Sequence, residues 1–194
     1  MRNGQFERKT KETDIFIEIN LDGEGKSEID TSIPFLDHML NLFSFHGSID
    51  LTIKATGDIE VDYHHLMEDL GISLGEAVKK ALGDKKGIRR YGEATIPMDE
   101  SLSQVVIDIS GRPYLVYKVT HRGKYLKGLE ASLFEDFFRA FSNHSLMNLH
   151  INLRYGRDAH HIFESIFKAF GRALQIAVSI DSKKKGIPST KGRL

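Results

Sequence analysis

The sequence contains no cysteine and no tryptophan. The lack of cysteine excludes disulfides, thiolate metal sites and cysteine nucleophiles together, and it is compatible with a reducing cytoplasm. No segment offers the roughly 18 uninterrupted apolar residues of a transmembrane helix, and the N-terminal segment MRNGQFERKTKETDIFIEIN lacks the apolar stretch of a signal peptide. We therefore expect a cytoplasmic protein that does not enter a membrane.

Net charge is also absent, because 27 Lys and Arg residues balance 27 Asp and Glu residues. A neutral chain has no global field that would draw its whole surface onto nucleic acid or an anionic membrane, so any anion recognition must be local. With 194 residues, 40% of them hydrophobic, the chain can form one sizeable core or two small coupled half-domains.

Two segments of the first half of the chain recur in the second half. LFSFHGSIDLTI (42–53) aligns with AFSNHSLMNLHI (140–151), and HHLMED (64–69) aligns with HHIFES (160–165). Such repetition indicates a duplicated supersecondary unit. We expect an α+β protein with two pseudo-symmetric halves, residues 1–86 and 87–182, packed as one unit and followed by an irregular C-terminal tail at 183–194.

Hydrophobic periodicity predicts the same order of elements in the two halves. Alternating apolar residues predict strands at 14–20, 27–31, 49–54, 93–97, 103–109, 114–119 and 148–154. Broad apolar faces predict helices at 34–47, 63–82, 131–146 and 159–179, the first of them opened by Pro34. Each half is therefore expected to end in the order strand, helix, strand, helix.

A His-His-x-x-Glu motif opens the last predicted helix of each half: His64, His65 and Glu68 in the first, His160, His161 and Glu164 in the second. Residues three or four apart on a helix share a face, so Glu68 neighbours both of its histidines, which themselves point about 100° apart. The two histidines of a pair can thus serve two different metal ions. By chance, a His-His pair with an acid at this spacing would occur only about 0.06 times in a chain of this composition, so metal binding is the favoured interpretation.

Further histidines occupy matching positions of the repeat. His38 of the first half aligns with Asp136 of the second, and His46 aligns with His144. Imidazole and carboxylate ligands without sulfur suit Mn²⁺, Zn²⁺, Fe²⁺ or Ni²⁺, and a ligand set sufficient for two octahedral ions favours Mn²⁺. Two histidines fall outside the scheme and are interpreted as surface or half-buried residues: His121 and His150.

Cations and hydroxyl donors beside predicted turns are candidates for binding an anion. Each alone is more often a solvated surface residue. Together with a metal site they can hold a phosphate group, arginine in bidentate fashion. They are Arg90, Arg112, Lys168, Ser189 and Lys191.

Six segments together resemble imidazoleglycerol-phosphate dehydratases, in this order and over nearly the whole chain: FLDHML, HHLMED, PMDESL, DISGRPYL, HHIFESIFKAFGRAL and IPSTKG. The resemblance implies a duplicated fold similar to ribosomal protein S5 domain 2, with helices packed between two β-sheets. It also implies active sites at the subunit interfaces of a large octahedral homo-oligomer of about 24 subunits.

The same resemblance implies two divalent ions per active site, usually Mn²⁺, with ligands at His38, His64, His65, Glu68, Asp136, His160, His161 and Glu164. The implied substrate contacts are Glu12, His38, His46, Arg90, Arg112, Lys168, Ser189, Thr190 and Lys191, and the implied catalytic groups are Glu12, His46, Glu68 and Glu164. Many family members carry His where this chain has Asp136, and Ser where it has Thr190. Aspartate is still a competent ligand and threonine keeps the hydroxyl, so the site is expected to survive both departures.

The implied reaction is the dehydration of D-erythro-imidazole glycerol phosphate to imidazole acetol phosphate in histidine biosynthesis. The substrate has no carbonyl to acidify its C–H bond, but a metal-bound imidazole can ionise to imidazolate and expel hydroxide, which gives a diazafulvene-like intermediate. Glu12 is expected to transfer one of the protons.

Two other interpretations remain open at the level of the residues. Paired His and Glu ligands also serve dimetal phosphoester hydrolases, and S5-like halves with the basic run at 183–185 suit an RNA-binding module. The neutral net charge and the absence of tryptophan argue against RNA. The expected partner is therefore a small phosphorylated imidazole, with no nucleic acid and no membrane.

Overall fold

A computed structural model of the chain describes residues 1–120, 125–126 and 128–194. The first half of this described part contains β1 (Asn3–Lys9), β2 (Thr13–Asn20), β3 (Ser27–Asp30), α1 (Pro34–Gly47), β4 (Asp50–Gly57) and α2 (His64–Leu82). The second half contains β5 (Tyr91–Met98), β6 (Ser101–Asp108), β7 (Tyr114–Lys118), β8 (Tyr125–Leu126), β9 (Leu129–Glu130), α3 (Leu133–Ser145), β10 (Asn148–Tyr155) and α4 (Ala159–Val178).

The two large sheets have the same topology. Their strand orders are β1-β2-β4-β3 and β5-β6-β10-β7. In the first sheet, β1 and β4 pair antiparallel with β2, while β3 pairs parallel with β4. The second sheet repeats this pattern with β5, β6, β10 and β7. The expected α+β fold with duplicated halves is therefore confirmed, while the boundaries after residues 86 and 182 stay predictions.

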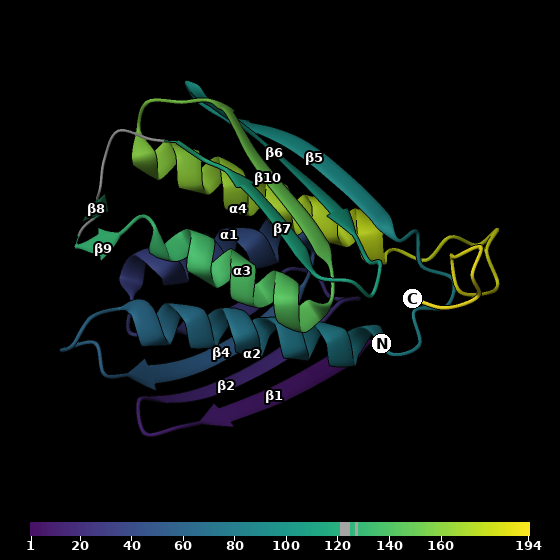
Figure 1. Cartoon of the computed structure of the whole chain (residues 1–194), viewed down its shortest axis with the longest axis horizontal. Helices are drawn as coiled ribbons and strands as arrows, with labels where there is room; N and C mark the ends of the chain where they lie inside the picture. The colour runs from purple at the N-terminus through teal and green to yellow at the C-terminus, as the bar shows by residue number, and fades with distance from the viewer. Residues whose placement is uncertain (121–124, 127) are drawn as a thin grey trace.

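The helices form two layers between the two sheets (Figure 1). Helix α2 packs on β1 and β2, α4 packs on β5 and β6, and the helix layers meet because α2 contacts α3 while α1 contacts α4. Each motif helix thus packs against a helix of the other half. Glycines permit this close approach: a Cβ on Gly71 would lie 2.4 Å from the carbonyl oxygen of Phe137, and one on Gly171 would lie 2.4 Å from that of Phe43.

The core is apolar and continuous between the sheets. Alternate residues of β2 are fully buried, as period-2 patterning predicts: Ile15, Ile17 and Ile19. Between α1, α3 and α4 the core is mainly phenylalanine, with Phe43 stacked on Phe170 at a centroid distance of 4.7 Å. This packing holds α4, one of the two motif helices, against α1 and α3.

Strand β1 is an element that the hydrophobic pattern did not predict. It is an edge strand whose side chains are mainly polar, and Gly4 is its buried residue. A Cβ on Gly4 would lie 2.0 Å from the carbonyl oxygen of Ala77 in α2, and one on Gly92 in β5 would lie 1.9 Å from that of Ala173 in α4. The same glycine contact therefore lets each edge strand cross its own motif helix.

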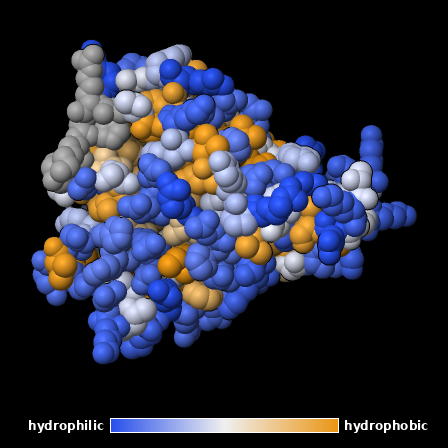
Figure 2. Space-filling view, viewed as in Figure 1, coloured by the Kyte–Doolittle hydropathy of each residue, from blue (hydrophilic) through white to orange (hydrophobic). Residues whose placement is uncertain are grey.

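Among the described residues, no helix combines the length and apolar character needed to span a bilayer. The face drawn in Figure 2 is largely hydrophilic, and its hydrophobic side chains lie in small separate patches.

Candidate metal centre

Helix α2 begins at its histidine pair and α4 begins one residue before its pair, and an aspartate two residues before the first histidine accepts hydrogen bonds from backbone N–H groups there. Asp158 accepts hydrogen bonds from the backbone N–H groups of His160 (2.8 Å) and His161 (3.3 Å). Asp62 accepts one from the backbone N–H of His64 (2.7 Å). Such capping fixes the first turn of a helix, and so it fixes where the imidazoles emerge.

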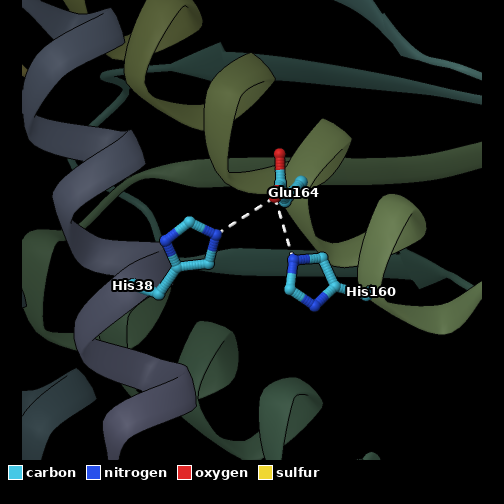
Figure 3. Close-up of side chains that lie close together, drawn as sticks. All are labelled: His38, His160 and Glu164. Atoms are coloured by element: carbon cyan, nitrogen blue, oxygen red, sulfur yellow. Dashed lines mark hydrogen bonds and ion pairs between the residues drawn. The ribbon is translucent and has the colours of Figure 1, made fainter.

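His38, His160 and Glu164 form the first cluster, at the contact of α1 with α4 (Figure 3). Nε2 of His38 lies 3.0 Å, and Nε2 of His160 lies 2.9 Å, from Oε1 of Glu164. The two imidazoles are 45% and 43% exposed, whereas the Glu164 side chain is only 11% exposed. The ligand atoms of the three residues all lie within 4.8 Å of one another.

The donor set of the first cluster fits a divalent ion. Two ligand atoms at right angles and about 2.1 Å from an ion lie about 3.0 Å apart, close to the spacings between Glu164 and the two imidazoles. The donors are nitrogen and oxygen without sulfur, as Mn²⁺, Zn²⁺ or Fe²⁺ accept.

Glu164 is held ionised inside this cluster. Burial opposes its charge, but hydrogen bonds from Lys168, His38 and His160 outweigh burial and lower its pKa to about 2. Nζ of Lys168 lies 2.7 Å from Oε2 of Glu164, so one carboxylate oxygen faces the ammonium and the other faces the imidazoles. An ionised carboxylate with one oxygen aimed at two imidazoles is competent to bind a cation.

His64, Glu68 and Asp136 form the second cluster, at the contact of α2 with α3. Nε2 of His64 lies 3.9 Å from Oε2 of Glu68, and Nδ1 of His64 lies 3.7 Å from Oδ2 of Asp136. These residues match His160, Glu164 and His38 in the duplication, so the second cluster has the same plan. It is looser and more exposed, with side chains 46%, 52% and 39% exposed.

The second histidine of each pair does not join the cluster beside it. Nδ1 of His65 lies 3.0 Å from Oδ2 of Asp58, and Nδ1 of His161 lies 2.7 Å from Oε2 of Glu100. These hydrogen bonds raise the pKa of both histidines. The pKa of Glu100 is lowered to about 2, by hydrogen bonds from the backbone of Asp158 and from His161.

The contacts of Asp58 with His65 and of Glu100 with His161 were not predicted from the sequence. Glu100 lies in the segment PMDESL, and like Glu12 it immediately precedes the second strand of its sheet. The pairing of these two positions under the duplication was the available signal. Glu12 itself lies beside the pair His64 and His65. Its Oε2 is 3.9 Å from Nδ1 of His65, and its side chain is 54% exposed.

A hollow of about 450 Å³ opens beside the first cluster. Its lining is mainly apolar and includes both imidazoles of the cluster: Ile33, Pro34, Phe35, His38, Tyr63, Leu126, Leu129 and His160. A flat ring of mixed apolar and polar character suits such a lining.

The other histidines differ in their surroundings. His46 lies in the last turn of α1. Its pKa is lowered, mainly by burial and to a lesser extent by the positive charges of Lys168 and Arg172. Its counterpart His144 instead faces a carboxylate, with Nδ1 3.1 Å from Oε1 of Glu76. His150 is half-buried on β10, and His121 lies outside the described residues.

Most of the expected phosphate-binding residues lie at the other end of the molecule (Figure 1). The backbone N–H of Arg90 donates to the carbonyl of Ala177, in the last turn of α4, and Arg112 is exposed in the turn between β6 and β7. Helix α4 has 20 residues and so spans about 30 Å. Within one chain, therefore, these arginines do not meet the clusters, whereas Lys168 does.

The tail residues belong to this far end. Arg90 holds it: the guanidinium contacts both carboxylate oxygens of Asp108 (2.7 and 3.1 Å) and donates to the carbonyl of Pro188 (3.0 Å). Ser189 accepts a hydrogen bond from the backbone N–H of Lys191 (3.2 Å), and Thr190 and Lys191 are exposed. Arg90 thus positions the segment that carries the other candidates.

The fold and the clusters define a class: duplicated α+β proteins whose paired helices carry histidine–carboxylate clusters that could hold a metal ion. The family model described as imidazoleglycerol-phosphate dehydratase matches residues 31–174. The chain belongs to this family.

Relatives of the same name agree over the full chain. The enzyme of Thermodesulfovibrio yellowstonii is 58% identical over 192 residues, 99% of either chain, and that of Syntrophus aciditrophicus is 57% identical over 195 residues. The crystal structure of the Staphylococcus aureus enzyme has a TM-score of 0.83 at 41% identity and covers 92% of this chain and 99% of its own. That of Pyrococcus furiosus has a TM-score of 0.84 at 39% identity, covering 97% and 100%. The activity is that of a hydro-lyase of histidine biosynthesis, so the dehydratase interpretation holds over the phosphoester hydrolase.

Proposed function

We propose that the chain dehydrates imidazoleglycerol phosphate with two divalent ions, most simply Mn²⁺, held by the first and second clusters. The observation that carries this proposal is the convergence of His38, His160 and Glu164, together with its looser copy at the matching positions of the other half. His65 and His161 would complete the ligand sets. An ion bound there would acidify the imidazole ring of the substrate.

The chain's own residues would orient the substrate and move its protons. The ring fits the hollow beside His38 and His160, where apolar walls exclude water from its faces. Glu12 is exposed beside His65, and its carboxylate would take the proton from the carbon next to the one that loses hydroxide. His46 would act from the end of α1, where its lowered pKa favours the neutral form that can accept a proton.

We further propose that each active site is built from more than one copy of the chain. The arginines and the tail lie about 30 Å from the clusters, whereas a small phosphorylated substrate must touch both groups at once. His65 and His161 face away from the clusters of their own chain, and Ile59 and Val61, beside His64, are exposed apolar residues that an interface would cover. A closed homo-oligomer, such as the 24-subunit assembly expected from the sequence, meets this requirement. A cytoplasmic location is part of the same proposal.

Mixing two impaired variants, assayed at a substrate concentration well below the KM of Arg112→Ala, tests this proposal. Arg112→Ala removes a phosphate contact and Glu164→Gln removes a metal ligand, so each alone should dehydrate imidazoleglycerol phosphate poorly. If the two residues serve one site from different chains, exchange of subunits between the variants will restore part of the activity in the presence of Mn²⁺. Mixtures that stay as inactive as the separate variants, despite proven subunit exchange, would show that each chain supplies its whole site.

A further inference from the structure

The second histidine of each pair contacts one carboxylate that belongs to neither cluster: His65 contacts Asp58, and His161 contacts Glu100. Glu100 lies in the turn between β5 and β6, and Asp58 lies in the segment between β4 and α2. These places do not correspond under the duplication, since the counterpart of Glu100 in the first half is Glu12. The same contact to Nδ1 is therefore built twice from different parts of the chain.

The contact determines which ring nitrogen is free. An ionised carboxylate only accepts hydrogen bonds, so the nitrogen that faces it must carry the proton. In a neutral imidazole with its proton on Nδ1, the lone pair is on Nε2. Nitrogen Nε2 is then available to a metal ion, and the carboxylate also fixes the plane of the ring.

We propose that Glu100 and Asp58 are positioning residues that hold His161 and His65 with Nδ1 protonated, so that Nε2 is the ligand nitrogen. The proposal rests on the proposed ligand role of the two histidines. It adds the residues that prepare each ring before an ion arrives.

Glu100 has a second set of contacts that makes the proposal testable. Its Oε1 accepts hydrogen bonds from the backbone N–H groups of Asp158 (2.7 Å) and Arg157 (3.3 Å), while Oε2 faces His161. A glutamine at this position must therefore keep its amide oxygen on the backbone side and turn its NH₂ group toward the ring. Nδ1 then becomes the acceptor, the proton moves to Nε2, and the ligand nitrogen is lost.

Asp58 differs in this respect. Within the described part of the chain, the Asp58 carboxylate forms its side-chain hydrogen bonds with Nδ1 of His65, at 3.0 and 3.2 Å. An asparagine can therefore turn its oxygen toward Nδ1 and leave the ring in its present state. The two amide variants should behave differently, although each removes one negative charge beside one histidine.

The experiment measures Mn²⁺ binding by the full chain, with calorimetry for affinity and ¹⁴N electron spin echo spectroscopy for coordinated imidazole. We expect Glu100→Gln to weaken Mn²⁺ binding about 10- to 100-fold at one site, with a reduced imidazole signal. Asp58→Asn should stay within about threefold of the parent protein, and Asp58→Ala should weaken binding as Glu100→Gln does. Glu28→Gln is the matched control, because this exposed acid of β3 pairs with Lys54 (3.3 Å) rather than with a proposed ligand; it should have little effect.

The possible outcomes separate the two proposals. If His161→Ala and His65→Ala leave Mn²⁺ binding unchanged, the ligand assignment fails. If they abolish binding at a site while Glu100→Gln keeps the parent affinity and imidazole signal, only the positioning role fails. Equal losses in Asp58→Asn and Asp58→Ala would show that charge rather than ring orientation matters, and would also overturn the positioning role. Thermal melts confirm folding, and the Asp58 variants test the idea independently if Glu100→Gln does not fold.

Discussion

The two clusters share one plan but differ in their surroundings. In the first, Glu164 pairs with Lys168 and is 11% exposed; in the second, Glu68 is 52% exposed, and the residue that matches Lys168 is Ile72. The duplication therefore supplied two equivalent sets of helix starts, and later differences one turn along the helix made one cluster compact and charge-paired.

The residue after each motif glutamate shows the same divergence. Asp69 is buried and forms an ion pair with Arg8 (2.9 Å) and a hydrogen bond with Thr13 (2.6 Å). Its counterpart Ser165 is buried against Ser103, with their hydroxyl oxygens 2.7 Å apart. The first half thus anchors its motif helix to the sheet through charge and the second half through neutral hydroxyls, while the glutamate of the motif is common to both.

Removing the motif glutamates should have the largest effect on activity, and it should show how the two clusters differ in their contribution to stability. We expect Glu164→Gln and Glu68→Gln each to lower kcat/KM by about 10³-fold or more, because a metal ion supplies several kcal/mol of transition-state stabilisation. Only Glu164→Gln should also lower the melting temperature, because it leaves the poorly exposed Lys168 without its anion. Activity, elemental analysis and thermal melts measure this, and full metal content with normal activity in Glu68→Gln would contradict its ligand role.

The edge-strand glycines should show that the scaffold, unlike the clusters, is equivalent in the two halves. Gly4→Ala and Gly92→Ala each place a Cβ about 2 Å from a helix carbonyl oxygen, so each should destabilise the fold by about 3 kcal/mol. That corresponds to a fall in melting temperature of about 6–12 °C. Gly186→Ala, where a Cβ meets nothing within 4 Å, is the control. A large difference between Gly4→Ala and Gly92→Ala would disprove the equivalence.

Much of this scaffold was predictable, because its signals are local. The helices and the duplicated order follow from periodicity, and the histidine pairs from spacing. Strand β1 was missed because an edge strand with polar side chains carries no apolar alternation, and its signal is a single glycine that meets a distant helix. The contacts of Glu100 and Asp58 with the histidines depend on where loops fold, which spacing does not report. The separation of Arg90 and Arg112 from the clusters is likewise a property of the folded chain.

The two far-end arginines should have different smaller effects. Arg112 is exposed, so Arg112→Ala should raise KM about 10- to 100-fold through loss of a charged hydrogen bond to phosphate, with little change in melting temperature. Arg90 is bound to Asp108 and Pro188, so Arg90→Ala should also lower the melting temperature. Steady-state kinetics beside thermal melts separates these effects. An unchanged KM in Arg112→Ala would remove this residue from the substrate site.

The smallest effect is expected from making the two clusters chemically alike. Asp136→His gives the second cluster the donor set of the first, and it replaces an anionic oxygen with a neutral nitrogen. Oxygen ligands suit Mn²⁺, whereas imidazole suits Zn²⁺ and Ni²⁺. At the second site the affinity for Mn²⁺ should therefore fall and the affinity for Zn²⁺ should rise, each by less than about tenfold. His38→Asp is the reciprocal change and should shift the first site the opposite way. Competition titrations with both metals measure these affinities. Loss of one bound ion in Asp136→His would contradict the expectation. It would mean that the second cluster depends on the Asp136 carboxylate, because its own glutamate is exposed whereas that of the first cluster is buried.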